Sequence, residues 1–134
     1  MAKKILLEIV TPEKIVLSRE VDSLIVPAAE GYLGILPGHA PLVSQLDTGV
    51  ASVKVDGEVE KMAVCCGFIE VVADKVTLLC DVAELAEEID VERALRAKKR
   101  AEERIAKKGA DVDLIRAEAA LKRSLARLGA AGRI

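Results

Sequence analysis

Aromatic residues are almost absent from this 134-residue chain, which has one tyrosine, one phenylalanine and no tryptophan. Proteins that bind single-stranded nucleic acids stack bases on aromatic side chains, and Tyr32 and Phe68 offer no such platform. Hydrophobic residues still make up 51% of the chain. We therefore expect a folded protein whose core is built from Val, Leu, Ile and Ala.

Cysteine is scarce, with three residues in the chain. Cys65 and Cys66 are adjacent, so in a regular strand they would point to opposite faces and would be poor joint metal ligands. With Cys80 they form no CxxC pair, and an odd count is not typical of a disulfide framework. We expect reduced, buried thiols in a cytosolic protein, and no metal site of its own.

Histidine is limited to His39, and the chain has no Walker A or GxGxxG sequence. A lone histidine cannot hold a metal without neighbouring carboxylates or thiols, and none is close in sequence. We therefore expect His39 to have a structural or interface role, and the chain to be no enzyme.

Long hydrophobic runs are also missing, since none approaches the ~20 residues that span a bilayer. Lys3 and Lys4 precede a segment that soon meets Glu8 and Pro12, which is too short and too interrupted for a signal peptide. We expect any membrane association to occur through a partner.

Charge is divided unevenly along the chain. Residues 1–86 carry 7 basic and 13 acidic side chains, whereas residues 87–134 carry 13 and 9. An acidic half followed by a basic half indicates two modules with different partners, although two solvated surfaces could also be imbalanced by accident.

The first 86 residues contain several short apolar or alternating runs. These predict strands at Ile5–Val10, Val21–Pro27, Ala51–Val55, Met62–Val72 and Lys75–Val82. Asp56-Gly57 and Ala73-Asp74 are the predicted hairpin turns. The glycine- and proline-rich segment 31–42 cannot be a plain strand interior and predicts an apolar loop, tucked under the sheets or used against a partner.

The pattern changes to a helical period at about Ala86. Asp90 is the expected N-cap of a first helix that runs to about Lys108 and ends at Gly109, and Asp111 is the expected cap of a second. The predicted apolar faces are Ala94, Ala97, Ala101 and Ile105 in the first helix, and Leu114, Ala117, Leu121, Leu125 and Leu128 in the second.

A helical hairpin of under fifty residues has little core of its own. A second apolar line suggests that it docks on the sandwich, on another subunit, or on each in turn, through Val91, Leu95, Val112, Ile115 and Ala119. Such a marginal element suits a conformational switch. The sequence thus predicts an α+β fold, with an N-terminal antiparallel β-sandwich (1–86) followed by a C-terminal α-helical hairpin (87–134).

Arginines recur along one stripe of the first predicted helix, at Arg93, Arg96, Arg100 and Arg104. One interpretation is a solvated face with local ion pairs, Glu92 to Arg96 and Glu103 to Lys107. The other is an anionic partner, either an acidic helix or a phosphate group. The second helix adds Lys122, Arg123 and Arg127, so arginines from both helices could converge on one anion.

Two motifs connect the chain to a known family. Residues 31–42, Gly-Tyr-Leu-Gly-Ile-Leu-Pro-Gly-His-Ala-Pro-Leu, resemble the signature loop of the epsilon subunit of bacterial F-type ATP synthases. Residues 66–71, Cys-Gly-Phe-Ile-Glu-Val, resemble its Gly-Gly-Phe-Leu-Glu-Val strand. Tyr32 stands where relatives often have an acidic or polar residue, and Cys66 replaces the first glycine of the second motif.

The resemblance implies a rotor subunit on the cytoplasmic face of the bacterial plasma membrane, which couples proton flow to ATP synthesis. Its sandwich would bind the gamma subunit and rest on the c-ring. The implied partner contacts are Glu30, Gly31, Tyr32, Gly34, Pro37, Gly38, His39, Ala40, Pro41 and Leu42.

The resemblance also implies a regulatory hairpin. Extended, it would meet the beta subunits and inhibit ATP hydrolysis. Folded, it would bind regulatory ATP through an Ile-Asp-x-x-Arg-Ala motif. The implied nucleotide residues are Ile89, Asp90, Arg93 and Ala94, with Glu84, Arg100, Arg123 and Arg127 in support.

Three other interpretations are weaker. A nucleic-acid-binding hairpin conflicts with the net acidity and the lack of aromatics. A small hydrolase on a β-sandwich conflicts with the lone His39. The equivalent subunit of an organelle would be expected to begin with a transit peptide, and none is evident in the sequence.

Overall fold

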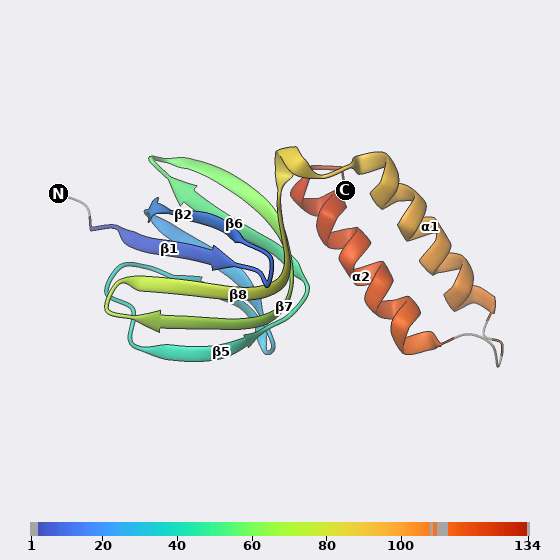
Figure 1. Ribbon diagram of the computed structural model, residues 1–134, viewed down its shortest axis with the longest axis horizontal. Coiled ribbons are helices and arrows are strands. Elements are labelled where there is room, and N and C mark those ends of the chain that lie inside the picture. The colour runs from blue at the N-terminus through green and yellow to red at the C-terminus, as the bar shows by residue number, and fades with distance from the viewer. Residues whose placement is uncertain (1–2, 108, 110–112, 134) are drawn as a thin grey trace.

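The computed structural model describes residues 3–107, 109 and 113–133. Within them, eight strands are followed by a 3-10 turn and two helices (Figure 1). The elements are β1 Ile5–Val10, β2 Ile15–Val21, β3 Ser23–Ala28, β4 Gly31–Ile35, β5 Leu42–Leu46, β6 Gly49–Val55, β7 Glu58–Val72, β8 Lys75–Leu85, η1 Ala86–Glu88, α1 Val91–Lys107 and α2 Leu114–Ala130.

The strands form a β-sandwich, as predicted, in the order β2-β1-β8-β7-β5-β3-β4, with β6 joined to both β3 and β7. The long strand β7 pairs with β6 through its first half and with β5 through its second. One pair departs from the predicted antiparallel arrangement, because β1 runs parallel to β8. Most of the domain lies between these two strands in sequence, so no tight turn forces them to be antiparallel.

The core is aliphatic, as predicted. Leu7, Ile9, Val26 and Leu78 are completely buried among similar side chains. Both aromatic rings lie at the surface instead, where Tyr32 is 64% and Phe68 is 54% exposed.

Both predicted hairpin turns are confirmed, and their residues have the positive φ that such tight turns require. The φ angles are 51° and 85° at Asp56-Gly57, and 48° and 63° at Ala73-Asp74. The strand predicted at Val21–Pro27 is wrong at its start, because Val21 ends β2 and β3 begins at Ser23. The strands β2 and β5 are absent from the sequence-based prediction.

The loop predicted at residues 31–42 is wrong for its first part. Gly31–Ile35 is the regular strand β4, paired antiparallel with β3. A tertiary partner has overridden the low strand propensity of glycine. The loop is therefore confined to residues 36–41, and it is tied to the far turn of β7–β8 where Gly38 N donates to Asp74 Oδ1 at 2.6 Å.

β7 bends at Cys66-Gly67, where φ is 49° and 138°, both outside the range of a regular strand, and where Cys66 has no partner in β8. The left-handed conformation of Cys66 breaks the alternation of side chains, so the expectation that Cys65 and Cys66 face opposite ways is wrong. Their sulfur atoms lie 3.0 Å apart. Cys65 and Cys80 are buried as expected, whereas Cys66 is exposed.

The predicted αα-hairpin is confirmed. Figure 1 shows α2 between the sandwich and α1, with α2 resting on β6 and β7. Asp90 Oδ1 accepts a hydrogen bond from Arg93 N at 3.1 Å, as an N-cap does. The second helix is capped by Asp113, which accepts from Arg116 N. The predicted cap Asp111 lies outside the described residues, as do Lys108 and Val112.

The helices bury small side chains more than leucines. On α1 the predicted face is confirmed at Ala94 and Ala101. On α2 the predicted stripe is wrong at Leu114, which is 44% exposed, and the buried residues are Ala117, Ser124, Ala126, Leu128 and Ala130. Small residues let the helix approach the sheet closely.

At Leu95 and Ile115 the second predicted apolar line does not make this contact. Leu95 is 44% and Ile115 is 80% exposed, so the sandwich is bound by a different face of the hairpin. In the part of the chain that the structure describes, neither helix is long and apolar enough to cross a membrane.

Candidate functional site

A groove between α1 and α2 gathers arginines from both helices. Its first section is a cavity of about 260 Å³ beside β8 and the start of α1. The residues that line it are Glu84, Glu88, Asp90, Arg93, Ala94, Ala97, Arg100 and Arg127. Two of these residues, Ala94 and Ala97, have short side chains that leave room for a ligand.

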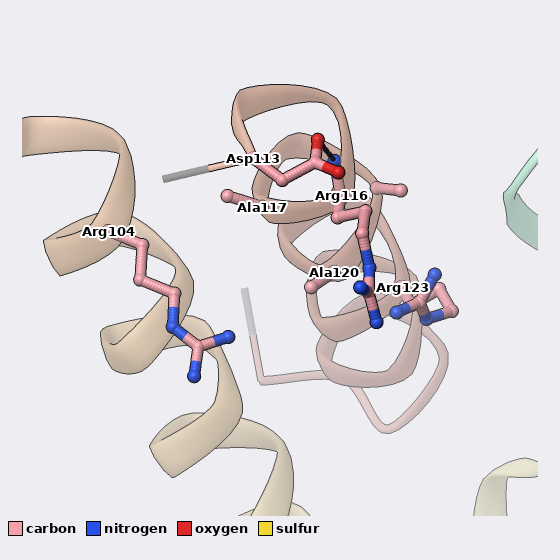
Figure 2. A pocket seen from close by; sticks show the side chains of 7 residues that line it. Arg104, Asp113, Arg116, Ala117, Ala120 and Arg123 are labelled. Atoms are coloured by element: carbon pink, nitrogen blue, oxygen red, sulfur yellow. Dashed lines mark hydrogen bonds between the residues drawn. The ribbon is translucent and has the colours of Figure 1, made fainter. Parts of the chain in front are cut away.

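The groove continues along the hairpin in two further sections. The middle section, of about 250 Å³, shares Arg100 and Arg127 with the first and adds Arg104 and Arg123. The distal section, of about 500 Å³, is shown in Figure 2, where Arg116 and Arg123 lie on α2 and Arg104 extends from α1. We call the three sections the arginine groove. Its first two sections together fall within the ~300–1,000 Å³ typical of small-molecule sites.

Most arginines of the arginine groove form no ion pair with the described residues, although Glu84, Glu88, Asp90 and Asp113 also line it. Arg127 Nε pairs with Glu84 Oε1. Among the described residues, no ion pair is formed by the other arginines of the groove, Arg93, Arg100, Arg104, Arg116 and Arg123. Guanidinium groups bind phosphates and carboxylates bidentately, so this arrangement suits a polyanion.

The helix-surface ion pairs expected from the sequence are not formed. Within the described residues, neither Glu92 with Arg96 nor Glu103 with Lys107 comes within salt-bridge distance. The arginine stripe is therefore not neutralised by its own helix, which favours the interpretation of an anionic partner.

The two ends of the groove differ in charge. Glu84, Glu88 and Asp90 stand together at the entrance, where α1 begins, and the arginines follow along both helices. Asp90 uses Oδ1 as the helix cap, and its other carboxylate oxygen makes no hydrogen bond to the described residues. A ligand with hydrogen-bond donors at one end and negative charge at the other matches this polarity.

The structure brings together most of the predicted nucleotide residues. Glu84, Asp90, Arg93, Ala94, Arg100 and Arg127 line the first section, and Arg123 lines the next. Ile89 does not line the groove, since it is 8% exposed and packs beneath the hairpin against Ala63 and Ala126.

Two residues that line the groove, Glu88 and Arg116, are absent from the sequence-based prediction of nucleotide-binding residues. Arg116 lies seven residues before Arg123, a spacing that places both on one helix face.

The hairpin is held to the sandwich by a thin contact. Ala126 and Ala130 pack on Ala63 and Ile89. Two ion pairs flank this patch, Arg127 with Glu84 and Lys122 Nζ with Asp47 Oδ2 at 3.4 Å. Val50 and Ala131 pack at the margin of this small patch, and both ion pairs are partly exposed. The interface is weak, because surface ion pairs contribute about 0–1 kcal/mol each.

The predicted partner contacts do not form one cluster. Tyr32 is paired with Pro27 near the turn between β5 and β6, on the hairpin side of the sandwich. Gly38 lies beside Asp74, at the other end of the sheet. His39 Nδ1 lies 2.7 Å from Ala40 O within the same loop. The predicted contact residues are therefore spread along β4 and the loop that follows it.

Comparisons with known proteins identify both halves of the chain. The family description "ATP synthase, Delta/Epsilon chain, beta-sandwich domain" matches residues 4–86. The description "ATP synthase, Delta/Epsilon chain, long alpha-helix domain" matches residues 87–132. The ATP synthase epsilon chain of Desulforamulus reducens is 50% identical over 131 residues, covering 98% of this chain and 99% of that protein. That of Moorella thermoacetica is 50% identical over 129 residues, with 96% of each chain covered.

Two solved structures of ATP synthases contain chains that resemble this one. A chain in the OSCP/F1/c-ring structure of the Euglena gracilis mitochondrial ATP synthase superposes with a TM-score of 0.82 and 27% identity, over 96% of this chain and 81% of that one. A chain in the central stalk/c-ring structure of the Tetrahymena thermophila mitochondrial ATP synthase has a TM-score of 0.55 at 17% identity, over 64% and 69%, and shows the fold alone. The chain therefore belongs to the ATP synthase delta/epsilon chain family.

Proposed function

We propose that this chain is the epsilon subunit of a bacterial ATP synthase, a non-catalytic part of the central stalk that binds the gamma subunit and the c-ring. Relatives named ATP synthase epsilon chain cover almost its full length. The similar Euglena chain comes from an assembly that contains the c-ring. The sandwich, with the exposed edge along β4, is the part that contacts the stalk, and it holds the chain at the cytoplasmic face of the membrane through the complex.

The arginine groove is the regulatory site of this subunit and binds ATP. The observation that carries this proposal is that the groove exists only while α1 and α2 lie side by side, with arginines of both helices along it. The phosphates lie among Arg93, Arg100 and Arg123, and the base or ribose donates hydrogen bonds to the carboxylates at the entrance.

ATP then binds the folded conformation of the hairpin and not the extended one. A molecule that binds the folded hairpin and not the extended one stabilises the folded form by its differential affinity. When ATP is scarce, the thin contact with the sandwich releases the hairpin. Its free arginines then meet an acidic surface of the beta subunits and inhibit ATP hydrolysis.

Calorimetric titration of the isolated chain with Mg-ATP tests the site. Arg93→Ala and Arg123→Ala remove groove arginines from α1 and from α2, and each is expected to weaken binding by about 10- to 100-fold, since a charged hydrogen bond contributes roughly 1.5–3 kcal/mol. Arg96→Ala is the matched control, because Arg96 is exposed on the same helix and lines no section of the groove.

The control variant should bind ATP as the wild type does. If the wild type shows no binding at millimolar ATP, the nucleotide proposal fails, and the arginines are left to the beta-subunit contact. Co-purification with the gamma subunit tests the stalk assignment separately and does not depend on the arginines.

A further inference from the structure

The bend of β7 holds a pair of thiols that the proposed function does not use. The sulfur atoms of Cys65 and Cys66 are 3.0 Å apart. Thr48 Oγ1 lies 3.3 Å from the first and 3.8 Å from the second. A disulfide bond requires a sulfur–sulfur distance of ~2.05 Å, so about 1 Å of movement would close the pair.

The three cysteines differ in access to solvent. Cys66 is exposed, whereas Cys65 is 8% and Cys80 is 4% exposed. Burial raises the pKa of Cys80 to about 12 and also raises the pKa of Cys65. The thiolate is the nucleophile in disulfide exchange, so reaction begins at Cys66 and Cys80 is excluded.

We propose that Cys65 and Cys66 are a reversible dithiol–disulfide site beneath α2, and that its oxidation by a low-molecular-weight disulfide loosens the docking of the hairpin. Cys66 attacks one sulfur of the disulfide and releases one thiol, which leaves a mixed disulfide on Cys66. Cys65 then attacks Cys66 Sγ and expels the second thiol, which takes up the proton of Cys65. The protein loses two electrons and two protons, and the disulfide becomes two thiols.

The resulting bond would be easy to reduce. Adjacent Cα atoms are ~3.8 Å apart, which is closer than the 4.4–6.8 Å usual for disulfides. Strained and accessible disulfides have oxidising potentials and are of the labile, regulatory kind. The site therefore responds to changes in redox conditions and adds no permanent cross-link.

The coupling to the hairpin comes from what lies against Cys65. Its side chain lines a small cavity together with Thr48 of the sandwich and with Arg123, Ala126 and Arg127 of α2. Closing the disulfide draws Cys65 Sγ towards the exposed Cys66 and away from this cavity. The packing beneath α2 is disturbed at the patch that holds the hairpin.

Mass spectrometry tests the site on the full chain. Reduced protein is incubated with glutathione disulfide, denatured, alkylated and cut with trypsin, which separates the peptide 62–75 from the peptide that contains Cys80. We expect peptide 62–75 to lose the mass of two hydrogen atoms and to escape alkylation, and dithiothreitol to reverse both changes. Two alkyl groups on this peptide, or a glutathione that stays on Cys66 without ring closure, would overturn the site.

The coupling is measured by amide hydrogen exchange of α2 in the oxidised and reduced protein, without nucleotide. We expect roughly three- to tenfold faster exchange in α2 after oxidation, with Cys66→Ser insensitive to the oxidant and Cys80→Ser behaving as the wild type. Equal exchange in the two forms would overturn the coupling. Since no ATP is present, this outcome is independent of the nucleotide proposal, which the inference goes beyond.

Discussion

Replacing Ala126 by glutamate is expected to detach the hairpin while the sandwich stays folded. Ala126 is 5% exposed and packs against Ala63, Ile89 and Ala130. The cavity of about 10 Å³ that it shares with Arg123 and Arg127 is too small to hold a glutamate side chain. Burying a carboxylate there costs about 2–4 kcal/mol, which exceeds what so thin a contact provides. Small-angle scattering should show a larger radius of gyration, and limited trypsin digestion should cut the helices faster.

Ala106→Glu is the matched control for this experiment. Ala106 is exposed on α1, which is separated from the sandwich by α2, so the same charge there should leave both readouts unchanged. ATP affinity should fall at least about tenfold in Ala126→Glu if the groove needs the docked hairpin. Unchanged scattering and digestion would show that the docking contact has been placed wrongly.

Replacing Gly67 by alanine is expected to have the largest effect on stability. A Cβ at this position would lie 1.8 Å from the backbone oxygen of Leu79, in the neighbouring strand β8. The φ of 138° is also one that L-residues rarely adopt. Because neither backbone can move without breaking the pairing of β7 with β8, we expect a loss of about 4 kcal/mol or more, or failure to fold.

Urea denaturation measures this loss, with Gly57→Ala as the reference. Gly57 has a φ of 85°, yet a Cβ there would meet no atom within 4 Å. Its replacement should cost about 1 kcal/mol for the backbone conformation alone. Equal costs for the two substitutions would mean that the close approach of Gly67 to Leu79 does not determine stability.

The parts of the fold that could be predicted are those in which a few neighbouring residues determine the local structure. Asp56-Gly57 predicts its hairpin because few other dipeptides adopt two positive φ angles easily. The strand β4 was not predictable in this way, since Gly31 and Gly34 disfavour strands and only the pairing with β3 stabilises it. The cap of α2 was placed two residues early because Asp111 and Asp113 are both suitable caps.

The candidate site also has parts that could be predicted from the sequence and parts that could not. Helical spacing is enough to place Arg93, Arg100 and Arg104 on one stripe, and α2 brings its own arginines opposite them. The closeness of Cys65 and Cys66 had no sequence signal, because it depends on the left-handed φ of Cys66 at the bend. Backbone conformations of this kind are fixed by tertiary packing and are not visible in side-chain periodicity.

We propose that ATP binds the arginine groove and thereby stabilises the folded hairpin. Amide hydrogen exchange of the isolated chain, with and without saturating Mg-ATP, tests it most directly. We expect slower exchange in α1 and α2 with ATP, and unchanged exchange in the sandwich strands β1 to β5. Exchange in both helices that is the same with and without ATP would contradict it.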